Sequence, residues 1–204
     1  MKSEKSNSEV LFTEKKKIDA VCIIPAAGLS SRMGCWKAEL LSKEGLFLIE
    51  KAVMTAREAC REVIVVGGYQ FSSLKKLITP HIDVRIVENR DYNSGMLGSI
   101  QAGLKYVKDD FFIFPMDMPL IVPEHFFRIS KIWEKDRVTR PIYRNIPGHP
   151  VVFPQDWKDK ILAMEGISLR KSIQWEDQDM IPWEDESVIF DMDSEVLYQA
   201  YLNS

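Results

Sequence analysis

The chain has 204 residues, of which 46% are apolar and 28% are charged. This balance is typical of a globular protein and excludes a chain that stays disordered for want of apolar residues. Its 27 Lys and Arg residues are outnumbered by 30 Asp and Glu residues, so the net charge is −3. Without a basic excess, neither a nucleic acid nor an anionic membrane is an expected partner.

Targeting and domain organisation are predicted from the apolar runs and from the first residues. No apolar run approaches the roughly 20 residues that cross a membrane, and the first twenty residues lack the apolar stretch of a signal peptide. We therefore expect a cytoplasmic protein. Lysine, glutamate and serine dominate residues 1–17, which we expect to form a flexible leader before a single domain over residues 18–204.

The cysteines and two of the histidines lie outside any recognisable motif. Cys22, Cys35 and Cys60 are odd in number and contain no CxxC pair, which argues against a disulfide framework and against a zinc site. Cys22 and Cys60 lie in apolar stretches and are expected in the core. His81 and His125 are expected at the surface.

Apolar runs of strand length alternate along the chain with stretches in which apolar residues recur every three or four positions. The runs predict strands over 18–25, 63–66, 83–88, 111–117, 138–142, 149–153 and 187–191. The periodic stretches predict helices over 46–60, 71–79, 95–107, 123–135, 155–173 and 194–202. Regular alternation is typical of right-handed βαβ units, so we predict the α/β class with a doubly wound, mostly parallel sheet. Ligands bind beyond the carboxyl ends of the strands in such sheets.

The segment Pro25–Lys37 (PAAGLSSRMGCWK) follows the first predicted strand and has the composition of a phosphate-binding loop. Small residues let backbone N–H groups approach an anion closely, and Arg32 and Lys37 supply fixed positive charge. The loop matches neither standard fingerprint, because Ser30 and Met33 stand where a dinucleotide loop and a Walker A loop need glycine. A structural turn with incidental cations is the alternative interpretation.

Three further segments place chemically useful residues at the predicted ligand edge. Asp117 lies near two prolines after a buried strand, where a carboxylate can hold Mg²⁺ against substrate phosphates or can simply cap the turn. Gly95 opens a helix whose N-terminal amides, with the Ser99 hydroxyl, can face an anion, although helix packing explains the glycines equally well. His149 lies between a glycine and a proline, so its ring is placed by a constrained backbone, either beside a substrate or packed in the core.

The letters AAGLSSRMGCWK resemble the A-A-G-x-S-x-R-M-G-x-x-K signature of the molybdopterin nucleotidyltransferases, and the molybdenum cofactor cytidylyltransferases are the most similar group among them. The resemblance extends through Asn89, through GMLGSIQAGL at Gly95–Leu104, through DMP at Asp117 and through GHPVVF at Gly148–Phe153. It covers nearly all of residues 18–204. The resemblance implies a Rossmann-like nucleotidyltransferase fold of the GT-A type and a Mg²⁺-dependent reaction.

The resemblance also implies a role for each matching residue. Catalysis is expected of Lys37, Arg32 and Asp117, and His149 is expected on the acceptor side. The expected nucleotide-binding residues are Ala26, Ala27, Gly28, Ser30, Lys37, Asn89, Gly95 and Ser99.

A second carboxylate usually shares Mg²⁺ with the first, and the sequence Phe190-Asp191-Met192-Asp193 offers two. Both follow a predicted strand, and alternate side chains of a strand point to the same side. The family pattern D-x-D-T-P-E-D is only partly kept, since this chain reads DMDSEV. We favour Asp193 as the second metal ligand and keep Asp191 as second choice. Either could instead be the N-cap of the last helix.

The reaction implied by the resemblance transfers CMP from CTP to the terminal phosphate of molybdopterin, as its molybdenum-bound cofactor, and releases pyrophosphate. A phosphate nucleophile is already deprotonated at neutral pH, so no general base is needed. Ala27 favours cytidine, because guanylyl-transferring relatives tend to carry A-G-G in this loop. The alternatives are a related transferase that uses GTP or another acceptor, such as an alcohol or a sugar phosphate, and a non-catalytic carrier that delivers cofactor to a molybdoenzyme partner.

Overall fold

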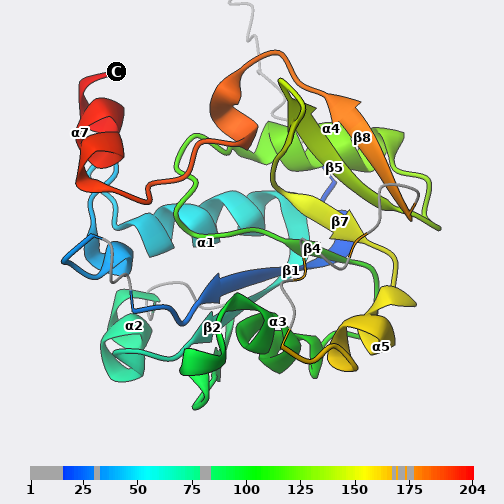
Figure 1. Ribbon diagram of the computed structural model, residues 1–204, viewed down its shortest axis with the longest axis horizontal. Helices are drawn as coiled ribbons and strands as arrows, with labels where there is room; N and C mark the ends of the chain where they lie inside the picture. Colours follow the sequence, from blue (N-terminus) through cyan, green and yellow to red (C-terminus); the bar gives the residue numbers. More distant parts are fainter. Residues whose placement is uncertain (1–15, 30–32, 79–83, 167–168, 170–172, 174–176) are drawn as a thin grey trace, which may run out of the picture.

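The computed structural model describes residues 16–29, 33–78, 84–166, 169, 173 and 177–204. Within these residues a sheet of eight strands lies between helices that cover both of its faces (Figure 1). One part of the sheet is parallel, in the order β3-β2-β1-β4, and consists of β1 (Ile18–Ala26), β2 (Cys60–Gly67), β3 (Val84–Glu88) and β4 (Phe111–Ile113). Ile23 of β1 pairs with Ile64 of β2 on one side and with Ile113 of β4 on the other. The central position of β1 explains its nearly continuous apolar sequence.

The other part of the sheet meets the first in an antiparallel pair. Its strands are β5 (Val138–Tyr143), β6 (Ile146–Pro147), β7 (Val151–Phe153) and β8 (Gln178–Pro182). Strand β7 is antiparallel to both β4 and β5, whereas β8 is parallel to β5. Among the described residues, four of the seven strand pairs are parallel. The predicted α/β class with a mostly parallel sheet is therefore confirmed.

Two hydrophobic clusters fill the space between the sheet and its helices. Alternate residues of β1 point to opposite faces, so Ile24 joins one cluster and Ile23 the other. The first cluster packs against α1 (Leu48–Ala59), α2 (Phe71–Ile78) and α4 (Pro123–Ile132). The second packs against α3 (Met96–Leu104) and α5 (Trp157–Leu162). Cys22 and Cys60 lie buried in the first cluster, as predicted.

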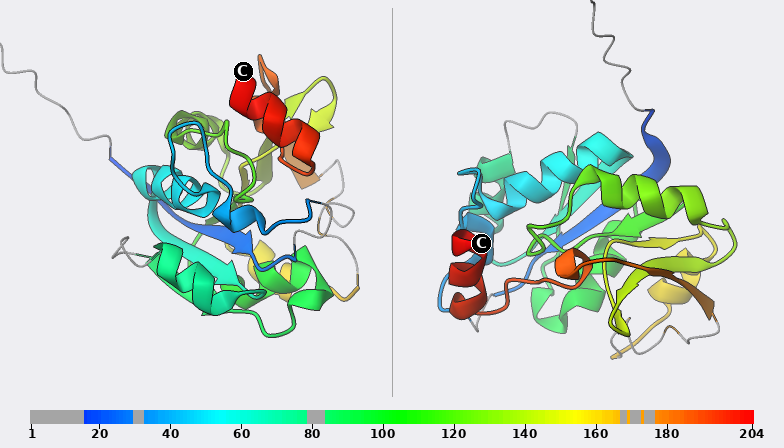
Figure 2. Two further views of the ribbon diagram at one scale, coloured as in Figure 1. Left: turned by 90° about the vertical axis from the view of Figure 1, so that its left-hand side faces the viewer. Right: turned by 90° about the horizontal axis from the view of Figure 1, so that it is seen from above.

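Helix α7 (Glu195–Asn203) lies at the end of the molecule to which the arrow of β1 points (Figures 1 and 2). Its Tyr201 is buried against Leu48 and Met192 in a small third cluster. This packing brings the segment before α7 to the carboxyl edge of the sheet, where the parallel strands end. No helix in the described ranges has the length and apolar character needed to span a bilayer.

Two predictions for the last third of the chain are wrong. Residues 187–191 form no strand, because Glu186–Val188 is a short 3-10 helix, η4, whose Ser187 N–H donates to Asp185 Oδ1 at 2.8 Å. Val188 is fully buried, so the apolar run reflects burial of a turn and not strand pairing. Strand β8, which was not predicted, begins nine residues before position 187; its sequence QDMIP has no alternation that distinguishes it from a loop.

Other elements are shorter than predicted for identifiable backbone reasons. The helix predicted over 155–173 ends at Leu162, and Gly166 takes a left-handed conformation with φ +63°. Residues 167–168, 170–172 and 174–176 lie outside the described ranges. Gly95, with φ +86°, keeps the next helix from beginning before Met96. The strand predicted over 111–117 ends at Ile113, two residues before Pro115, which has no N–H to donate.

Candidate active site

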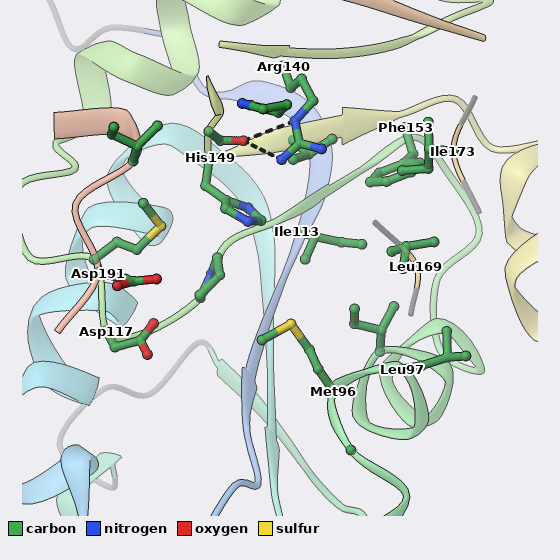
Figure 3. Close-up of a pocket in the computed structure, with 18 of the residues that line it drawn as sticks. Met96, Leu97, Ile113, Asp117, Arg140, His149, Phe153, Leu169, Ile173 and Asp191 are labelled. Carbon is green, nitrogen blue, oxygen red and sulfur yellow. Dashed lines mark hydrogen bonds between the residues drawn. The ribbon is translucent and has the colours of Figure 1, made fainter. Parts of the chain in front are cut away.

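A cavity of about 870 Å³ lies beside the carboxyl edge of the sheet (Figure 3). Its walls come from the start of α3, from β4 and the residues after it, from β5 and β7, and from the segment that follows η4. Asp117 and Asp191 lie together on one side, and Leu97, Phe153 and Ile173 form an apolar region on the other (Figure 3). The cavity therefore joins an acidic side to an apolar side.

The acidic side is organised around one lysine. Lys37 Nζ lies 2.7 Å from Asp117 Oδ2 and 2.5 Å from Asp193 Oδ1, and only 10% of the lysine side chain is exposed. Burial alone would lower the pKa of Lys37, but the two carboxylates together outweigh burial and raise it above its ordinary value. The ammonium group is therefore positively charged at neutral pH and holds together two acids that would otherwise repel each other.

Backbone contacts bring these three residues together from distant parts of the sequence. Lys37 begins the short 3-10 helix η1 (Lys37–Glu39). Phe114 N donates to Ile23 O, which carries the chain from β4 along the edge of β1 towards Asp117. Met192 N donates to Asp117 O at 2.9 Å, so the segment containing Asp193 is fastened directly to the residue that it must reach.

The structure decides two of the alternatives left open for the C-terminal acids. Ser194 is the N-cap of α7, since its Oγ accepts a hydrogen bond from Leu197 N, so neither Asp191 nor Asp193 is the cap. The two acids also do not end a strand, contrary to prediction. Both acids line the cavity; Asp193 is hydrogen-bonded to Lys37, and Asp191 lies beside Asp117 (Figure 3).

The donor set is compatible with a magnesium ion that is shared with substrate phosphates. Mg²⁺ prefers oxygen ligands and is often held in proteins by one or two carboxylates, the remaining ligands being water and phosphate. Asp117 and Asp193 provide two such carboxylates, and both contact the ammonium group of Lys37. Within the described ranges no group of three or more His, Cys, Asp or Glu residues is arranged to hold a metal by protein ligands alone. Asp117 and Asp193 are therefore the residues that would hold such an ion together with a substrate phosphate.

The loop after β1 begins at the sheet edge as predicted by its sequence. Ala26 and Ala27 are buried, and Ala27 O accepts a hydrogen bond from Tyr69 N. A Cβ atom on Gly28 would meet no atom of the described residues within 4 Å, so the space above Gly28 is open on their side. Ser30 and Arg32 lie outside the described residues. Gly68, which sequence reasoning did not select, lets the next loop approach closely, because a Cβ there would lie 2.9 Å from the Cβ of Ala27.

Asn89 and Ser99 contact each other. Asn89 Nδ2 donates to Ser99 Oγ at 3.3 Å, and Asn89 Oδ1 accepts from Asp91 N at 3.1 Å. Both side chains are buried. Gly95 lies between them in sequence and on the cavity wall, at the N-terminus of α3. The pair fixes the turn between β3 and α3, and with it the position of the helix N-terminus at the cavity.

His149 lies on the cavity wall, with its ring between Asp117 and the apolar side (Figure 3). Gly148 N donates to Pro141 O and His149 N donates to Val188 O, both at 2.8 Å. A Cβ on Gly148 would lie 2.3 Å from Val188 O, so only glycine fits there. The histidine that shares its motif with this glycine is therefore held in place from two sides.

His125 is buried, so the prediction of a surface position is wrong. Its ring stacks on Trp183 at a centroid distance of 5.0 Å, and Nε2 lies 2.9 Å from Ser187 Oγ. Burial lowers the pKa of His125 below its ordinary value. His81 lies outside the described residues.

Sequence reasoning also missed Arg140, which is buried and lies on the cavity wall. The one sign of it in the sequence is that a charged residue stands inside the strand predicted over 138–142.

Residues 22–180 match the model of the MobA-like NTP transferase domain, so the chain is a nucleotidyltransferase of that family. It is 30% identical to the molybdenum cofactor cytidylyltransferase of Escherichia coli over 177 residues, which cover 85% of this chain and 90% of that protein.

Two further proteins show how far the similarity reaches. A protein of Chloroflexus aggregans, named probable molybdenum cofactor guanylyltransferase, is 33% identical over 104 residues, which cover 50% of this chain and 47% of that protein. The crystal structure of Rv0371C from Mycobacterium tuberculosis in complex with manganese aligns with a TM-score of 0.72 at 18% identity. That alignment covers 92% of this chain and all of the other, and at this identity it shows a common fold.

Proposed function

We propose that this nucleotidyltransferase transfers CMP from CTP to the terminal phosphate of molybdopterin, in the form of the molybdenum cofactor, with release of pyrophosphate. The observation that carries the proposal is the Lys37 ammonium group between Asp117 and Asp193, beside a cavity of about 870 Å³. Identity of 30% to a cytidylyltransferase over most of both chains supports the choice of nucleotide and acceptor.

Asp117 and Asp193 are proposed as the metal ligands, with Asp191 as second choice. Oxygen donors at the sheet edge favour Mg²⁺, and the manganese complex of a protein with the same fold supports a divalent cation. When bound, the cation would act as a Lewis acid that neutralises charge on the α-phosphate.

Lys37 and Arg32 are proposed to offset the charge of the departing pyrophosphate. Because its carboxylate neighbours raise the pKa of Lys37, this side chain stays protonated in the physiological pH range, so its ammonium group can donate hydrogen bonds to phosphate oxygens. The reaction needs two anions to approach each other, so positioning and charge neutralisation contribute more than covalent chemistry by the protein.

The nucleotide is proposed to bind along the loop after β1 and at the N-terminus of α3. The open space over Gly28 and the backbone amides at the start of α3 suit phosphate oxygens. The proposed nucleotide-binding residues are Ala26, Ala27, Gly28, Ser30, Lys37, Asn89, Gly95 and Ser99. Asn89 and Ser99 act indirectly in this scheme, since their side chains fix the turn before α3.

The acceptor is proposed to enter the cavity on the side of His149, with its terminal phosphate directed to the acidic side. His149 orients the acceptor by hydrogen bonding, and no residue is required to remove a proton from an ionised phosphate. The apolar wall formed by Leu97, Phe153 and Ile173 excludes water from the non-reacting part of the acceptor.

GTP is the second candidate nucleotide. The 33% identity to a protein named as a guanylyltransferase favours it, whereas Ala27 favours CTP. The test is pyrophosphate release from CTP, GTP, ATP and UTP with Mg²⁺, with and without molybdenum cofactor. Release that requires both CTP and cofactor is the expected result. Preference for GTP would overturn the nucleotide assignment, and nucleotide binding without any release would favour a carrier protein.

A further inference from the structure

Helices α3 and α5 lie next to each other on one face of the sheet (Figure 1). Ile100 and Leu104 of α3 belong to the same hydrophobic cluster as Trp157 and Ile161 of α5. These apolar contacts fix the faces at which the two helices meet. They leave the end of α5 unsatisfied, because the last four carbonyl groups of a helix have no partner inside it.

Gln101 of α3 supplies hydrogen-bond donors to this end of α5. Its Nε2 atom donates to the carbonyl oxygens of Met164, Ile161 and Leu162 at 2.9, 3.0 and 3.4 Å. The amino end of the amide has to face these three acceptors, since the side-chain oxygen would be repelled by them. Gln101 therefore fastens the last turn of α5, and the chain that follows it, to α3.

A second polar contact joins the same two helices at a distance from the cavity. Lys158 Nζ, in the first turn of α5, donates at 2.6 Å to Val107 O, which lies three residues beyond the end of α3. Neither Lys158 nor Val107 is among the described residues that line the cavity, whereas Gln101 and Met164 are. Of these two contacts between the helices, the one at Gln101 thus borders the cavity.

The chain after α5 forms part of the apolar side of the cavity. Met164, Glu165 and Gly166 line it, and Met164 packs against the cluster that contains Phe153. Phe153 lies on the apolar side of the cavity, together with Leu169 (Figure 3). This is the side on which the non-reacting part of the acceptor is proposed to bind.

Other contacts hold α3 itself in place. Ser99 accepts a hydrogen bond from Asn89 at its N-terminal end. A Cβ atom on Gly103 would lie 3.0 Å from side-chain carbons of Ile23 and Val66, so the helix backbone lies directly against the sheet. Loss of the Gln101 amide should therefore release the end of α5 and leave the N-terminus of α3 where it is.

We infer that Gln101 is a positioning residue for the acceptor: its amide holds residues 163–166 against α3, and this wall in turn fits the non-reacting part of the acceptor. The inference rests on the proposed function, because it requires the acceptor to occupy this cavity. The nucleotide is proposed to bind at the loop after β1 and at the start of α3, so its binding should not depend on this amide.

The first measurement is hydrogen exchange of the full chain without ligands. The amides of Ala163 and Met164 bond to Asp159 O and Ile161 O and report on the end of α5. Gln101→Met keeps the length of the side chain and removes its donors, so we expect exchange of these two amides to become at least tenfold faster. Lys158→Met is the matched control, because it breaks the contact away from the cavity, and should change their exchange by less than threefold.

The second measurement is binding of purified molybdopterin and of CTP by calorimetry. We expect Gln101→Met to weaken molybdopterin binding at least fivefold and to leave CTP binding within twofold. Lys158→Met should leave both affinities within twofold even if it lowers Tm as much. Gln101→Lys, whose ammonium group can donate to the same carbonyl oxygens, should bind molybdopterin within threefold of the wild type.

Three results would overturn the inference: unchanged exchange in Gln101→Met, molybdopterin binding within twofold of wild type in that variant, or equal weakening of molybdopterin and CTP. An equal loss of molybdopterin binding in Lys158→Met would also overturn it, since the effect would then follow stability alone. If circular dichroism shows that Gln101→Met does not fold, Gln101→Lys carries the test, and a fivefold loss of molybdopterin binding with unchanged exchange would contradict the inference. A wild type that binds no molybdopterin would refute the proposed acceptor, whereas the exchange comparison would still decide whether Gln101 holds the wall.

Discussion

Replacing Lys37 by methionine removes the positive charge that lies between two carboxylates. The oxygens of Asp117 and Asp193 that bond Lys37 lie 2.7 and 2.5 Å from Nζ, so they can be no further apart than the sum of these distances, 5.2 Å. Two unit charges at that separation repel by about 1 kcal/mol in water and by about 3 kcal/mol at an effective dielectric constant of 20. Since 44% of the Asp193 side chain is exposed, solvent screens the pair and the lower value applies more closely.

A divalent cation should relieve this repulsion in the variant. We expect Lys37→Met to bind Mg²⁺ without nucleotide, whereas in the wild type the ammonium group competes for the same carboxylates. A ligand at 100 times its Kd stabilises a protein by about 2.7 kcal/mol, which for a chain of this size raises Tm by roughly 5–11 °C. The assay is thermal unfolding during a MgCl₂ titration, and the wild type should shift by less than about 2 °C over the same range.

Two further variants make the Lys37 prediction specific. Lys160→Met removes an exposed lysine paired with Asp156 and should respond to Mg²⁺ as the wild type does. Adding Asp193→Asn to Lys37→Met should abolish the response, because only one carboxylate of the pair then remains. Equal shifts in the wild type and in Lys37→Met would refute the reasoning, since they would mean that the lysine does not occupy the position of a metal.

The remaining predictions concern other parts of the structure. Asp193→Asn should lower the rate of pyrophosphate release about 100-fold or more, and Asp191→Asn should retain activity within about tenfold; the reverse order would exchange their roles. Gly148→Ala should lower stability by about 1–3 kcal/mol, because the new Cβ would meet a backbone oxygen at 2.3 Å. Gly28→Ala, whose Cβ would contact none of the described residues, should stay within about 0.5 kcal/mol of the wild type in urea unfolding. Burial lowers the pKa of His125, so the unfolded state binds more protons, and the free energy of unfolding should fall as the pH drops from about 6.5 through the lowered pKa of the folded state. Urea unfolding of His125→Gln should show a weaker loss of stability over the same pH range. An identical pH dependence in the variant and the wild type would contradict this assignment.

The parallel part of the fold could be predicted from the sequence because its signal is local. Residues 18–25 are apolar on both faces, as a strand covered by helices must be, and the apolar spacing in residues 46–60 matches one helix face. The same reasoning failed near residue 188. There the apolar residues fill space around a turn, and a turn that buries apolar residues has the composition of a strand. Strand β8 was missed because its pairing with β5 is decided by tertiary contacts and not by its own residues.

The same distinction applies to the candidate site. The loop after β1 and Asp117 could be chosen from sequence because each lies shortly after a buried apolar run that forms a strand. The contact of Lys37 with Asp193 spans 156 positions and depends on Met192 N bonding Asp117 O, which no local pattern encodes. Arg140 was missed for a related reason: a charged residue in a predicted strand is usually interpreted as facing solvent, and only the packed structure places it against a cavity.

The strands on either side of the antiparallel β4–β7 pair supply different residues to the site. Lys37 and Asp117 follow β1 and β4, whereas Arg140 and His149 belong to the segment from β5 to β7. Within residues 138–150, positions other than Gly148 can therefore be varied without directly changing β1 or β4, whereas β7 pairs with β4 and has to be kept. Such a division would let the proposed acceptor side of the cavity change while Lys37 and Asp117 are retained. A library confined to residues 138–150, with Gly148 unchanged, is the corresponding starting point for engineering.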